Sequence, residues 1–166
     1  MIPDKPMMDR YRWLGLAIGV ALADQGAKHW IAGTFPLGAG ETVLPFFNLV
    51  HILNSGAAFS FLANAGGWQR YVFIALALVV SVGLTIILLK GVANRWEGWG
   101  YSLLLGGAVG NLVDRLVQGA VVDYLDFHAG GWHWPAFNLA DTALCLSAFI
   151  LLLGTLLSSA QSKAPT

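Results

Sequence analysis

Long apolar runs dominate the pattern of hydrophobic and polar positions along the chain. Residues 71–89 and 142–162 contain no Asp, Glu, Lys or Arg, and each run approaches the ~20 mostly apolar residues with which a helix crosses a bilayer. Two further apolar runs are each interrupted by a pair of charged residues. We therefore interpret residues 1–166 as one integral membrane domain. The predicted spans cover roughly residues 13–31, 71–89, 98–117 and 138–160.

The two longer links between these spans have a different pattern. Residues 32–70 are rich in Gly, Pro, Asn and aromatic residues, and apolar and polar positions alternate in patches between Glu41 and Leu53. This favours short strands at the membrane surface. Residues 118–137 contain three glycines, a proline and two tryptophans, a composition typical of the membrane interface.

The positions of the cations predict the orientation. Six of the nine Lys and Arg residues precede the first span, join the second and third, or follow the fourth. Because Lys and Arg near span ends are retained in the cytoplasm, both termini should be cytoplasmic and both longer links external.

The N-terminal residues also fit a second interpretation. Residues 1–12, the apolar residues 13–22 and the sequence Ala21-Leu22-Ala23 resemble the three regions of a cleavable signal peptide. Cleavage would leave three spans, place the termini on opposite sides and remove the charge pattern. We retain the segment as the first span, and N-terminal sequencing of the mature protein can overturn this choice.

Composition supports a membrane protein and excludes several other classes. The chain is 57% hydrophobic and 11% charged, with a mean hydropathy of +0.66. Nine basic and nine acidic residues give no net charge, so we expect no binding to nucleic acid. The single cysteine, Cys145, excludes an internal disulfide or a multi-cysteine metal site, and we expect it to pack as a small hydrophobic residue.

Acidic residues gather at the predicted outer side of the membrane. Ionisable groups at membrane depth are costly unless they are paired or hydrated, so this concentration indicates a functional site. The six of nine acidic residues on this side are Asp24, Glu41, Asp114, Asp123, Asp126 and Asp141.

Several residues near this cluster have structural explanations. Asp24 and Lys28 lie one helical turn apart, which predicts an ion pair that stabilises the site. Asp114 and Arg115 share a helix end and are expected to position other groups through hydrogen bonds. The Gly-x-x-x-Gly spacing at residues 106–110 favours close approach of two helices.

The start of the last span allows two interpretations. Asn138 followed by Asp141 fits a helix N-cap with a carboxylate in the first turn. Asn138, Asp141, Thr142 and Cys145 also form a stripe at helical spacing. We expect this stripe to face into the bundle and to line a cavity.

Asp123 and Asp141 are the candidate catalytic pair. Asp123 has no cation beside it in the sequence, and considered alone it would be a turn or cap residue. Two adjacent carboxyls do not both ionise readily, so they share a proton and can supply a base and an acid in one step. Aspartic proteases activate water against a peptide bond in this way.

Five sequence blocks between residues 24 and 142 together resemble a known family. They are Asp24-Gln-Gly-Ala-Lys28, Asn54-Ser-Gly-Ala-Ala-Phe-Ser-Phe, Gly107-Ala-Val-Gly-Asn-Leu-Val-Asp-Arg115, Val121-Val-Asp-Tyr124 and Phe137-Asn-Leu-Ala-Asp-Thr142. In this order the blocks resemble bacterial lipoprotein signal peptidase, also called signal peptidase II. One departure is Tyr124, where the family often has Phe.

This resemblance implies an all-α membrane protein, a four-helix bundle in the bacterial inner membrane with a small extracytoplasmic β-cradle and a short periplasmic helix. It implies that the signal peptide is removed from a prolipoprotein just before a diacylglyceryl cysteine, at the periplasmic face, without a metal or organic cofactor. The expected partners are this prolipoprotein and membrane lipid, and we expect a monomer. The implied catalytic residues are Asp123 and Asp141, with supporting positions at Asn54, Asn111, Asp114, Arg115, Asn138, Asp24 and Lys28.

Other functions fit the sequence less well. The chain has no His-Glu-x-x-His motif for zinc, and His128 and His133 are expected at the interface. The serines show no recognisable base partner. An ion transporter could use Lys28 and Arg115, but transporters commonly have inverted repeats and sites near mid-bilayer, and no repeat is visible. A structural scaffold would not require so many unpaired acids.

Overall fold

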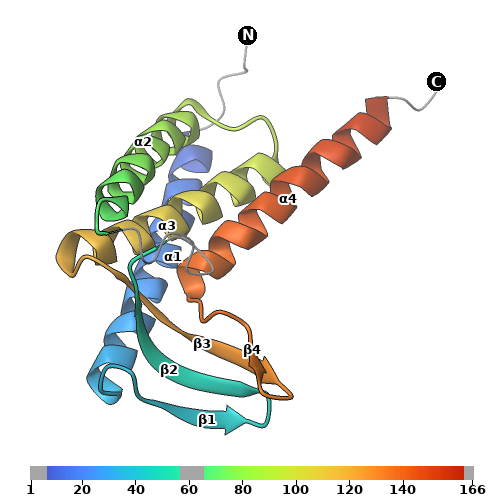
Figure 1. Ribbon diagram of the computed structural model, residues 1–166. Helices are drawn as coiled ribbons and strands as arrows, with labels where there is room; N and C mark the ends of the chain where they lie inside the picture. Colours follow the sequence, from blue (N-terminus) through green and yellow to red (C-terminus); the bar gives the residue numbers. More distant parts are fainter. Residues whose placement is uncertain (1–6, 57–65, 163–166) are drawn as a thin grey trace.

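Four helices and four strands make up the structure, a computed structural model that describes residues 7–56 and 66–162 (Figure 1). The helices are α1 (Met7–Thr34), α2 (Gln69–Lys90), α3 (Arg95–Val117) and α4 (Leu139–Ser162). The strands are β1 (Gly40–Leu44), β2 (Phe47–Asn54), β3 (Val121–Ala129) and β4 (Trp132–His133). Each helix overlaps one of the predicted apolar segments, and the strands lie in the two longer links.

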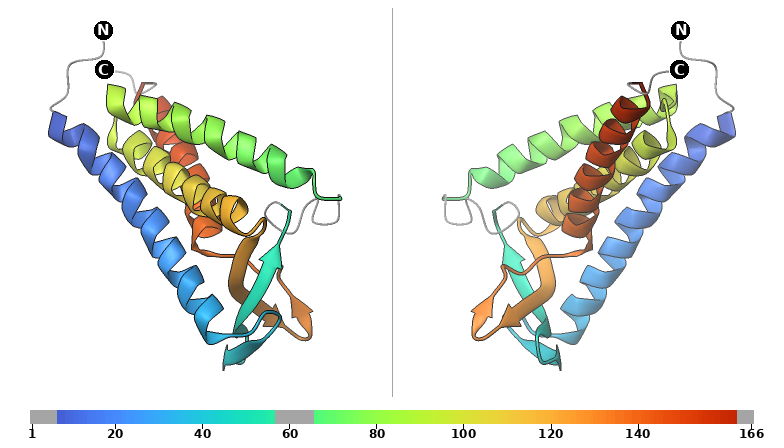
Figure 2. Two further views of the ribbon diagram at one scale, coloured as in Figure 1. Left: turned by 90° about the vertical axis from the view of Figure 1, so that its left-hand side faces the viewer. Right: turned by 90° about the vertical axis from the view of Figure 1, so that its right-hand side faces the viewer.

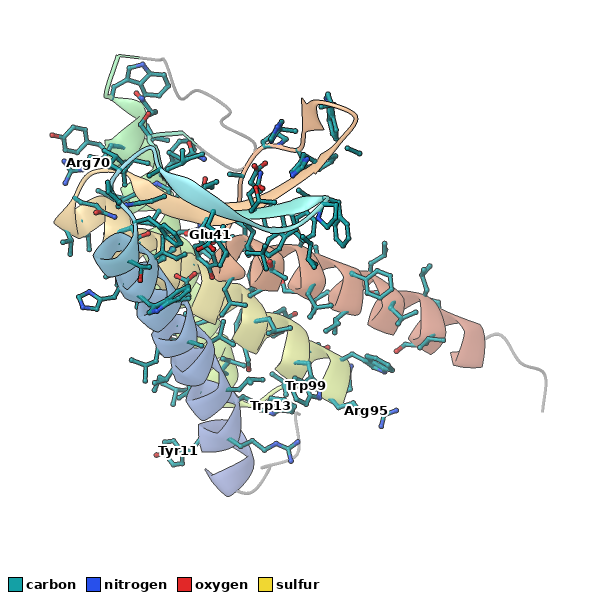
Figure 3. All side chains as sticks on the ribbon, turned by 90° about the horizontal axis from the view of Figure 1, so that it is seen from below. Tyr11, Trp13, Glu41, Arg70, Arg95 and Trp99 are labelled. Atoms are coloured by element: carbon teal, nitrogen blue, oxygen red, sulfur yellow. The ribbon has the colours of Figure 1, made fainter. Side chains whose placement is uncertain are left out.

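The helices alternate in direction, and α3 packs against each of the other three. α1 begins and α4 ends at the same end of the molecule, and the sheet lies at the opposite end (Figure 2). At the end away from the sheet, the rings of Trp13 and Trp99 meet edge to face with 5.7 Å between centroids (Figure 3). The Arg12 guanidinium lies 4.4 Å from the Trp13 ring. Such mixed aromatic and basic residues are typical of a membrane interface.

Glycines let the backbone of α3 approach both α1 and α4. A Cβ atom on Gly106 would lie 2.7 Å from the carbonyl oxygen of Ala17 in α1. A Cβ atom on Gly107 would lie 2.6 Å from the carbonyl oxygen of Ala140 in α4. The close approach predicted from the glycine spacing is confirmed, and α3 thereby holds the first turn of α4 at a fixed distance.

The first helix is packed into the bundle along its length. Trp13 and Ala17 belong to an apolar core shared with α2 and α3, and Ile31 belongs to a second core shared with β3. Removal of residues up to Ala23 would take Trp13 and Ala17 out of the first core. Retention of these residues as part of the first span stays a prediction.

The strands form one antiparallel sheet in the order β1-β2-β3-β4. Short strands are confirmed in the first link. In the second link, Asp123 is the third residue of a nine-residue strand and not a turn or cap residue. The register pairs Ile52 with Asp123 and Asn54 with Val121. The strand therefore carries Asp123 to the side of Asn54, a contact that sequence spacing does not show.

Polar side chains lie inside the bundle, and many large apolar side chains face outward. Asp24 and Asp114 are buried, whereas Leu22, Val79 and Phe149 are each more than half exposed. This is the arrangement expected of a protein surrounded by lipid. By length and composition, α2 and the Leu139–Ser159 part of α4 are apolar enough to cross a membrane.

The described residues are mostly helical, with one small antiparallel sheet. They contain no additional short helix that could be the implied periplasmic one. Residues 57–65 of the first link lie outside the described part of the chain, so that element stays an expectation.

We expect Gly107→Ala to lower the free energy of unfolding in detergent by about 1–3 kcal/mol, because the added methyl group meets the backbone of α4. Gly83→Ala in α2 is the matched control, since its Cβ would meet nothing within 4 Å. It should leave stability unchanged or raise it slightly. Equal thermal unfolding of the two variants would contradict the close packing of α3 on α4.

Candidate active site

Polar side chains from both the bundle and the sheet meet where these two parts of the molecule join. The predicted site residues form one hydrogen-bonded network, and all except Asp141 are buried. These residues are Asp24, Lys28, Asn54, Asn111, Asp114, Arg115, Asp123, Asn138 and Asp141.

Asp123 is the third residue of β3, and 2% of its surface is exposed. Its Oδ1 accepts a hydrogen bond of 2.7 Å from the side-chain amide of Asn138, and its Oδ2 accepts one of 3.0 Å from that of Asn54. Burial, followed by the negative charge of Asp141, raises the pKa of Asp123 to about 7. Near neutral pH this carboxyl group can therefore hold a proton.

Asp141 lies in the first turn of α4 and caps that helix together with Asn138. The Asp141 backbone N–H donates to Asn138 Oδ1 at 2.9 Å, and the Asn138 backbone N–H donates to Asp141 Oδ2 at 3.3 Å. The predicted N-cap is confirmed. The other carboxylate oxygen, Oδ1, accepts a hydrogen bond of 2.8 Å from the Asn111 side chain.

Neutral amides, and not cations, bind the two carboxylates. Asn138 contacts both of them, and its side chain also lies 3.3 Å from Asn111 Oδ1. Among the described residues, no Lys or Arg lies within ion-pair distance of Asp123 or Asp141. A carboxylate is stabilised less by a neutral donor than by a cationic donor. This environment therefore allows Asp123 and Asp141 to retain one proton between them.

Lys28 directs its charge toward two other carboxylates. Its Nζ atom lies 2.8 Å from Asp24 Oδ2 and 2.8 Å from Asp114 Oδ2. The predicted ion pair with Asp24 is confirmed, and Asp114 is a second acidic partner. Lys28 also donates to Asn111 Oδ1 at 2.9 Å, so its contact with Asp141 is indirect and passes through this amide.

Side chains from α1 and β3 complete the cap of α4. The Ala140 backbone N–H donates to Asp24 Oδ1 at 2.9 Å, and the Leu139 backbone N–H donates to the Tyr124 hydroxyl at 3.1 Å. Burial raises the pKa of Tyr124 to about 12, so this hydroxyl stays neutral. Tyr124 is the residue that departs from the family pattern, and its hydroxyl group has a hydrogen-bond partner in the Leu139 N–H. The sequence indicated only that a buried tyrosine hydroxyl needs some partner.

Arg115 holds the end of β2 beside the site. Its Nη2 donates to the carbonyl oxygen of Gly56 at 2.8 Å, and its Nη1 donates to that of Asn111 at 3.3 Å. Gly56 in turn donates its N–H to Asn54 Oδ1 at 2.9 Å. These hydrogen bonds connect Arg115 through Gly56 to Asn54, which donates to Asp123, and the positioning role of Arg115 stays a prediction.

Asp114 and Gln25 tie α1, α3 and β3 together. Asp114 Oδ2 accepts a hydrogen bond of 3.0 Å from the Val122 backbone N–H, as expected for a positioning residue. Gln25 donates to Asp114 Oδ1 at 2.8 Å and to the Gly110 carbonyl oxygen at 3.0 Å. Sequence reasoning did not select Gln25, although it lies inside the first of the five blocks.

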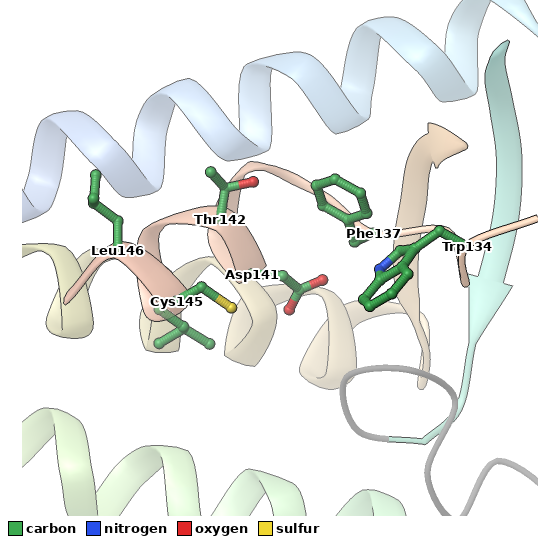
Figure 4. Close-up of a pocket in the computed structure, with 7 residues that line it drawn as sticks. Trp134, Phe137, Asp141, Thr142, Cys145 and Leu146 are labelled. Carbon is green, nitrogen blue, oxygen red and sulfur yellow. The ribbon is translucent and has the colours of Figure 1, made fainter. Parts of the chain in front are cut away.

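A cavity of about 410 Å³ opens beside Asp141 on the exposed face of α4 (Figure 4). Apart from the Asp141 carboxylate its wall is mainly apolar, so it can accept a hydrophobic group next to the site. The lining residues are Trp134, Phe137, Asp141, Thr142, Leu144, Cys145 and Leu146.

The predicted orientation of part of the α4 stripe is wrong. Thr142 and Cys145 are exposed and line this open cavity, so they do not face into the bundle. Cys145 is accordingly not a packed core residue. The reason is that the small residues Ala140, Ala143 and Ser147 are the buried face of α4, which turns Cys145 outward.

Asp126, His128 and His133 of the sheet form a separate group. Asp126 accepts a hydrogen bond of 2.8 Å from Asn48, and it lies 2.8 Å from His133 Nδ1. The rings of His128 and His133 stack with 4.9 Å between centroids, and Glu41 is exposed on β1. Within the described residues, no group of three or more His, Cys, Asp or Glu is arranged to hold a metal ion.

Comparisons with known proteins agree with this architecture. A family model described as Signal peptidase (SPase) II matches residues 16–157. The chain is 44% identical to the lipoprotein signal peptidase of Yersinia enterocolitica over 154 residues, covering 92% of this chain and 91% of that protein. It is 50% identical to the lipoprotein signal peptidase of Vibrio vulnificus over 145 residues, covering 86% of each.

Two solved structures are also similar, and both are described as bacterial membrane enzymes studied by the in meso method. One, at 2.3 Å resolution, has a TM-score of 0.81 and 29% identity, covering 93% of both chains. The other, at 1.9 Å resolution, has a TM-score of 0.74 and 30% identity, covering 87% of this chain and 92% of that chain. The resemblance inferred from the five sequence blocks is confirmed, and the chain belongs to the signal peptidase II family.

Proposed function

We propose that the protein is an intramembrane aspartic endopeptidase that removes the signal peptide from diacylglyceryl-modified prolipoproteins, cutting just before the lipidated cysteine. The family and its lipoprotein signal peptidase members support a peptidase with this class of substrate. The observation that carries the aspartic mechanism is the joint attachment of Asp123 and Asp141 to Asn138, with no cation paired to either carboxylate in the described residues.

In the proposed mechanism Asp141 is ionised, and Asp123 carries the shared proton. Water between the two carboxyl groups gives a proton to Asp141 as its oxygen attacks the scissile carbonyl carbon. Asp123 gives its proton to the carbonyl oxygen, so a neutral tetrahedral intermediate forms. The position of Asp141 at a helix N-terminus favours its ionised state, and the raised pKa of Asp123 favours its protonated state.

Collapse of this intermediate restores the enzyme. Asp141 passes its proton to the nitrogen of the departing cysteine as the C–N bond breaks. A hydroxyl group of the intermediate returns a proton to Asp123 and becomes the carbonyl of the new carboxyl end. One water is consumed, and the pair again holds one proton, so no metal or organic cofactor is required.

The position of the cavity supports a lipid-linked substrate. A diacylated peptide resides in the bilayer, and the cavity beside Asp141 is largely apolar and opens on the outer side of α4. We propose that the lipidated cysteine approaches from this side. The extended peptide next to it can pair with an exposed strand edge of the sheet.

We further propose that all four helices cross the inner membrane, with cytoplasmic termini, a periplasmic active site and a monomeric enzyme. Asp24, Lys28 and Asp114, which lie in the predicted spans of α1 and α3, are buried and paired with one another, which lowers the cost of placing these helices in lipid. The start of α1 and the end of α4 share the end away from the sheet (Figure 2).

Asp123→Asn and Asp141→Asn should each lower kcat for a lipidated precursor by at least about 10³-fold, because an amide cannot take or give the shared proton. The measurement is the appearance of shortened product from purified protein in detergent. Asp126→Asn is the matched control, since Asp126 lies on the same strand but binds Asn48 and His133. Substantial turnover by a folded Asp123 or Asp141 variant would exclude the dyad.

Activity should fall as pH rises through the ionisation of Asp123. Its pKa is raised to about 7, so above this value the pair loses the proton that the mechanism gives to the carbonyl oxygen. We expect the alkaline limb of kcat/KM near this pH, and a second decline in acid, where both carboxyl groups are protonated. Initial rates in one detergent across the pH range test this, and a profile that stays flat through neutral and alkaline pH would contradict it.

The proposed topology can be tested by labelling single cysteines in a Cys145→Ser background. Ala129→Cys, in the sheet, should react with a membrane-impermeant maleimide from the periplasmic side. Lys90→Cys, at the opposite end of the bundle, should react only after the inner membrane is opened. Labelling of the residue 90 variant in sealed spheroplasts would contradict the orientation.

A further inference from the structure

Arg70 lies near the start of α2, but its side chain reaches the end of α3 (Figure 3). Its Nε donates to the carbonyl oxygen of Arg115 at 2.9 Å, and its Nη2 donates to that of Leu116 at 3.3 Å. These contacts join two helix ends that are 45 residues apart in the chain.

The contact meets a physical need at this helix end. The last four carbonyl groups of a helix have no partner within it, and a cation near them also interacts favourably with the helix dipole. In α3, the Asp114 carbonyl is taken by the Gln118 N–H at 2.9 Å. The Arg70 guanidinium donates hydrogen bonds to the next two carbonyls, those of Arg115 and Leu116. Its planar arrangement of N–H groups can reach two acceptors at once.

The same guanidinium also packs against the turn that leads to β3. Gly119 has a φ of +86°, and a Cβ atom on it would lie 3.0 Å from Arg70 Nη1. On the inner side of this connection, Asp114 Oδ2 accepts the Val122 N–H at 3.0 Å. The chain between α3 and Asp123 is therefore held from two sides, by Asp114 and by Arg70.

We propose that Arg70 is a positioning residue for catalysis, and this role rests on the function proposed above. By fixing the last turn of α3 and the turn at Gly119, Arg70 sets the place of Arg115 and the start of the strand that carries Asp123. Arg70 contacts neither carboxylate and acts through the backbone.

Substitution of Arg70 should therefore affect chemistry more than substrate binding. We expect Arg70→Gln to lower kcat by about 10- to 100-fold with little change in KM, as a small displacement of a catalytic group does. Arg70→Lys should keep an intermediate rate, because an ammonium retains the charge but not the planar fork. The control Arg95→Gln removes an exposed positive charge at the other end of the bundle and should keep the wild-type kcat.

The pH profile separates positioning from loss of folded enzyme. A displaced Asp123 changes its coupling to Asp141, so the alkaline limb should move in Arg70→Gln. If the substitution only lowered the amount of folded protein, the rate would fall at every pH and the limb would stay in place. Arg70→Lys supplies the same measurement if Arg70→Gln does not fold.

A second pair of variants tests the contact without any substrate. Gly119→Ala should reduce thermal stability more than Gly131→Ala, which has a similar φ of +82° but meets nothing within 4 Å. In a double-mutant cycle, Arg70→Gln and Gly119→Ala should be less than additive, because each breaks the same contact. Additive effects, or a kcat of Arg70→Gln equal to that of Arg95→Gln, would overturn the proposal. A wild-type protein that cleaves no lipidated precursor would instead reject the proposed function and leave the stability cycle valid.

Discussion

The arrangement of the site depends on where its two buried cations direct their charge. Lys28 lies against Asp24 and Asp114, and Arg115 donates to backbone carbonyl groups. Asp123 and Asp141 are left with amide donors alone among the described residues. If either cation paired directly with them, both would ionise readily and neither would keep a proton at neutral pH. The proton that the proposed mechanism assigns to Asp123 can thus be retained, because the cations are bound elsewhere.

The same network also supplies hydrogen-bond partners to backbone groups, which must be satisfied inside the protein when they lie within a membrane. Asp24 binds Lys28 and at the same time accepts the Ala140 N–H at the start of α4. This contact requires α1, α3 and α4 to lie close together. Gly110 permits it, since a Cβ atom there would lie 2.5 Å from Asp24 Oδ2. The glycines of α3 and the buried charges therefore depend on each other.

The sequence predicted the parts of this arrangement that are local. The apolar runs, the ion pair at i and i+4, and the cap formed by Asn138 and Asp141 each involve neighbouring residues. The sequence did not predict the strand around Asp123, because that strand is defined by its pairing with β2, about 70 residues earlier in the chain.

The sequence also did not predict features that depend on which face of a helix is buried or on contacts between distant elements. Cys145 faces outward because Ala140, Ala143 and Ser147 form the buried face of α4, and small residues on several faces of α4 left this choice open. The sequence also did not predict the hydrogen-bond partner of the Tyr124 hydroxyl, because the Leu139 N–H lies on a different element. The residue type indicated that a hydrogen-bond partner was needed, but it did not indicate which group would be that partner.

The two aspartates occupy different environments, and this difference supports separate roles. Asp123 is almost fully buried on a strand, where desolvation favours its neutral form. Asp141 is partly exposed to the cavity and lies at a helix N-terminus, where the N–H groups and the helix dipole favour an anion. In the mechanism proposed above, water and substrate that enter through the cavity meet the Asp141 carboxylate first, and the Asp123 proton lies on the buried side of the pair. The proposed base therefore faces the cavity and the proposed acid is buried, and these surroundings support the assignment of Asp141 as base and Asp123 as acid.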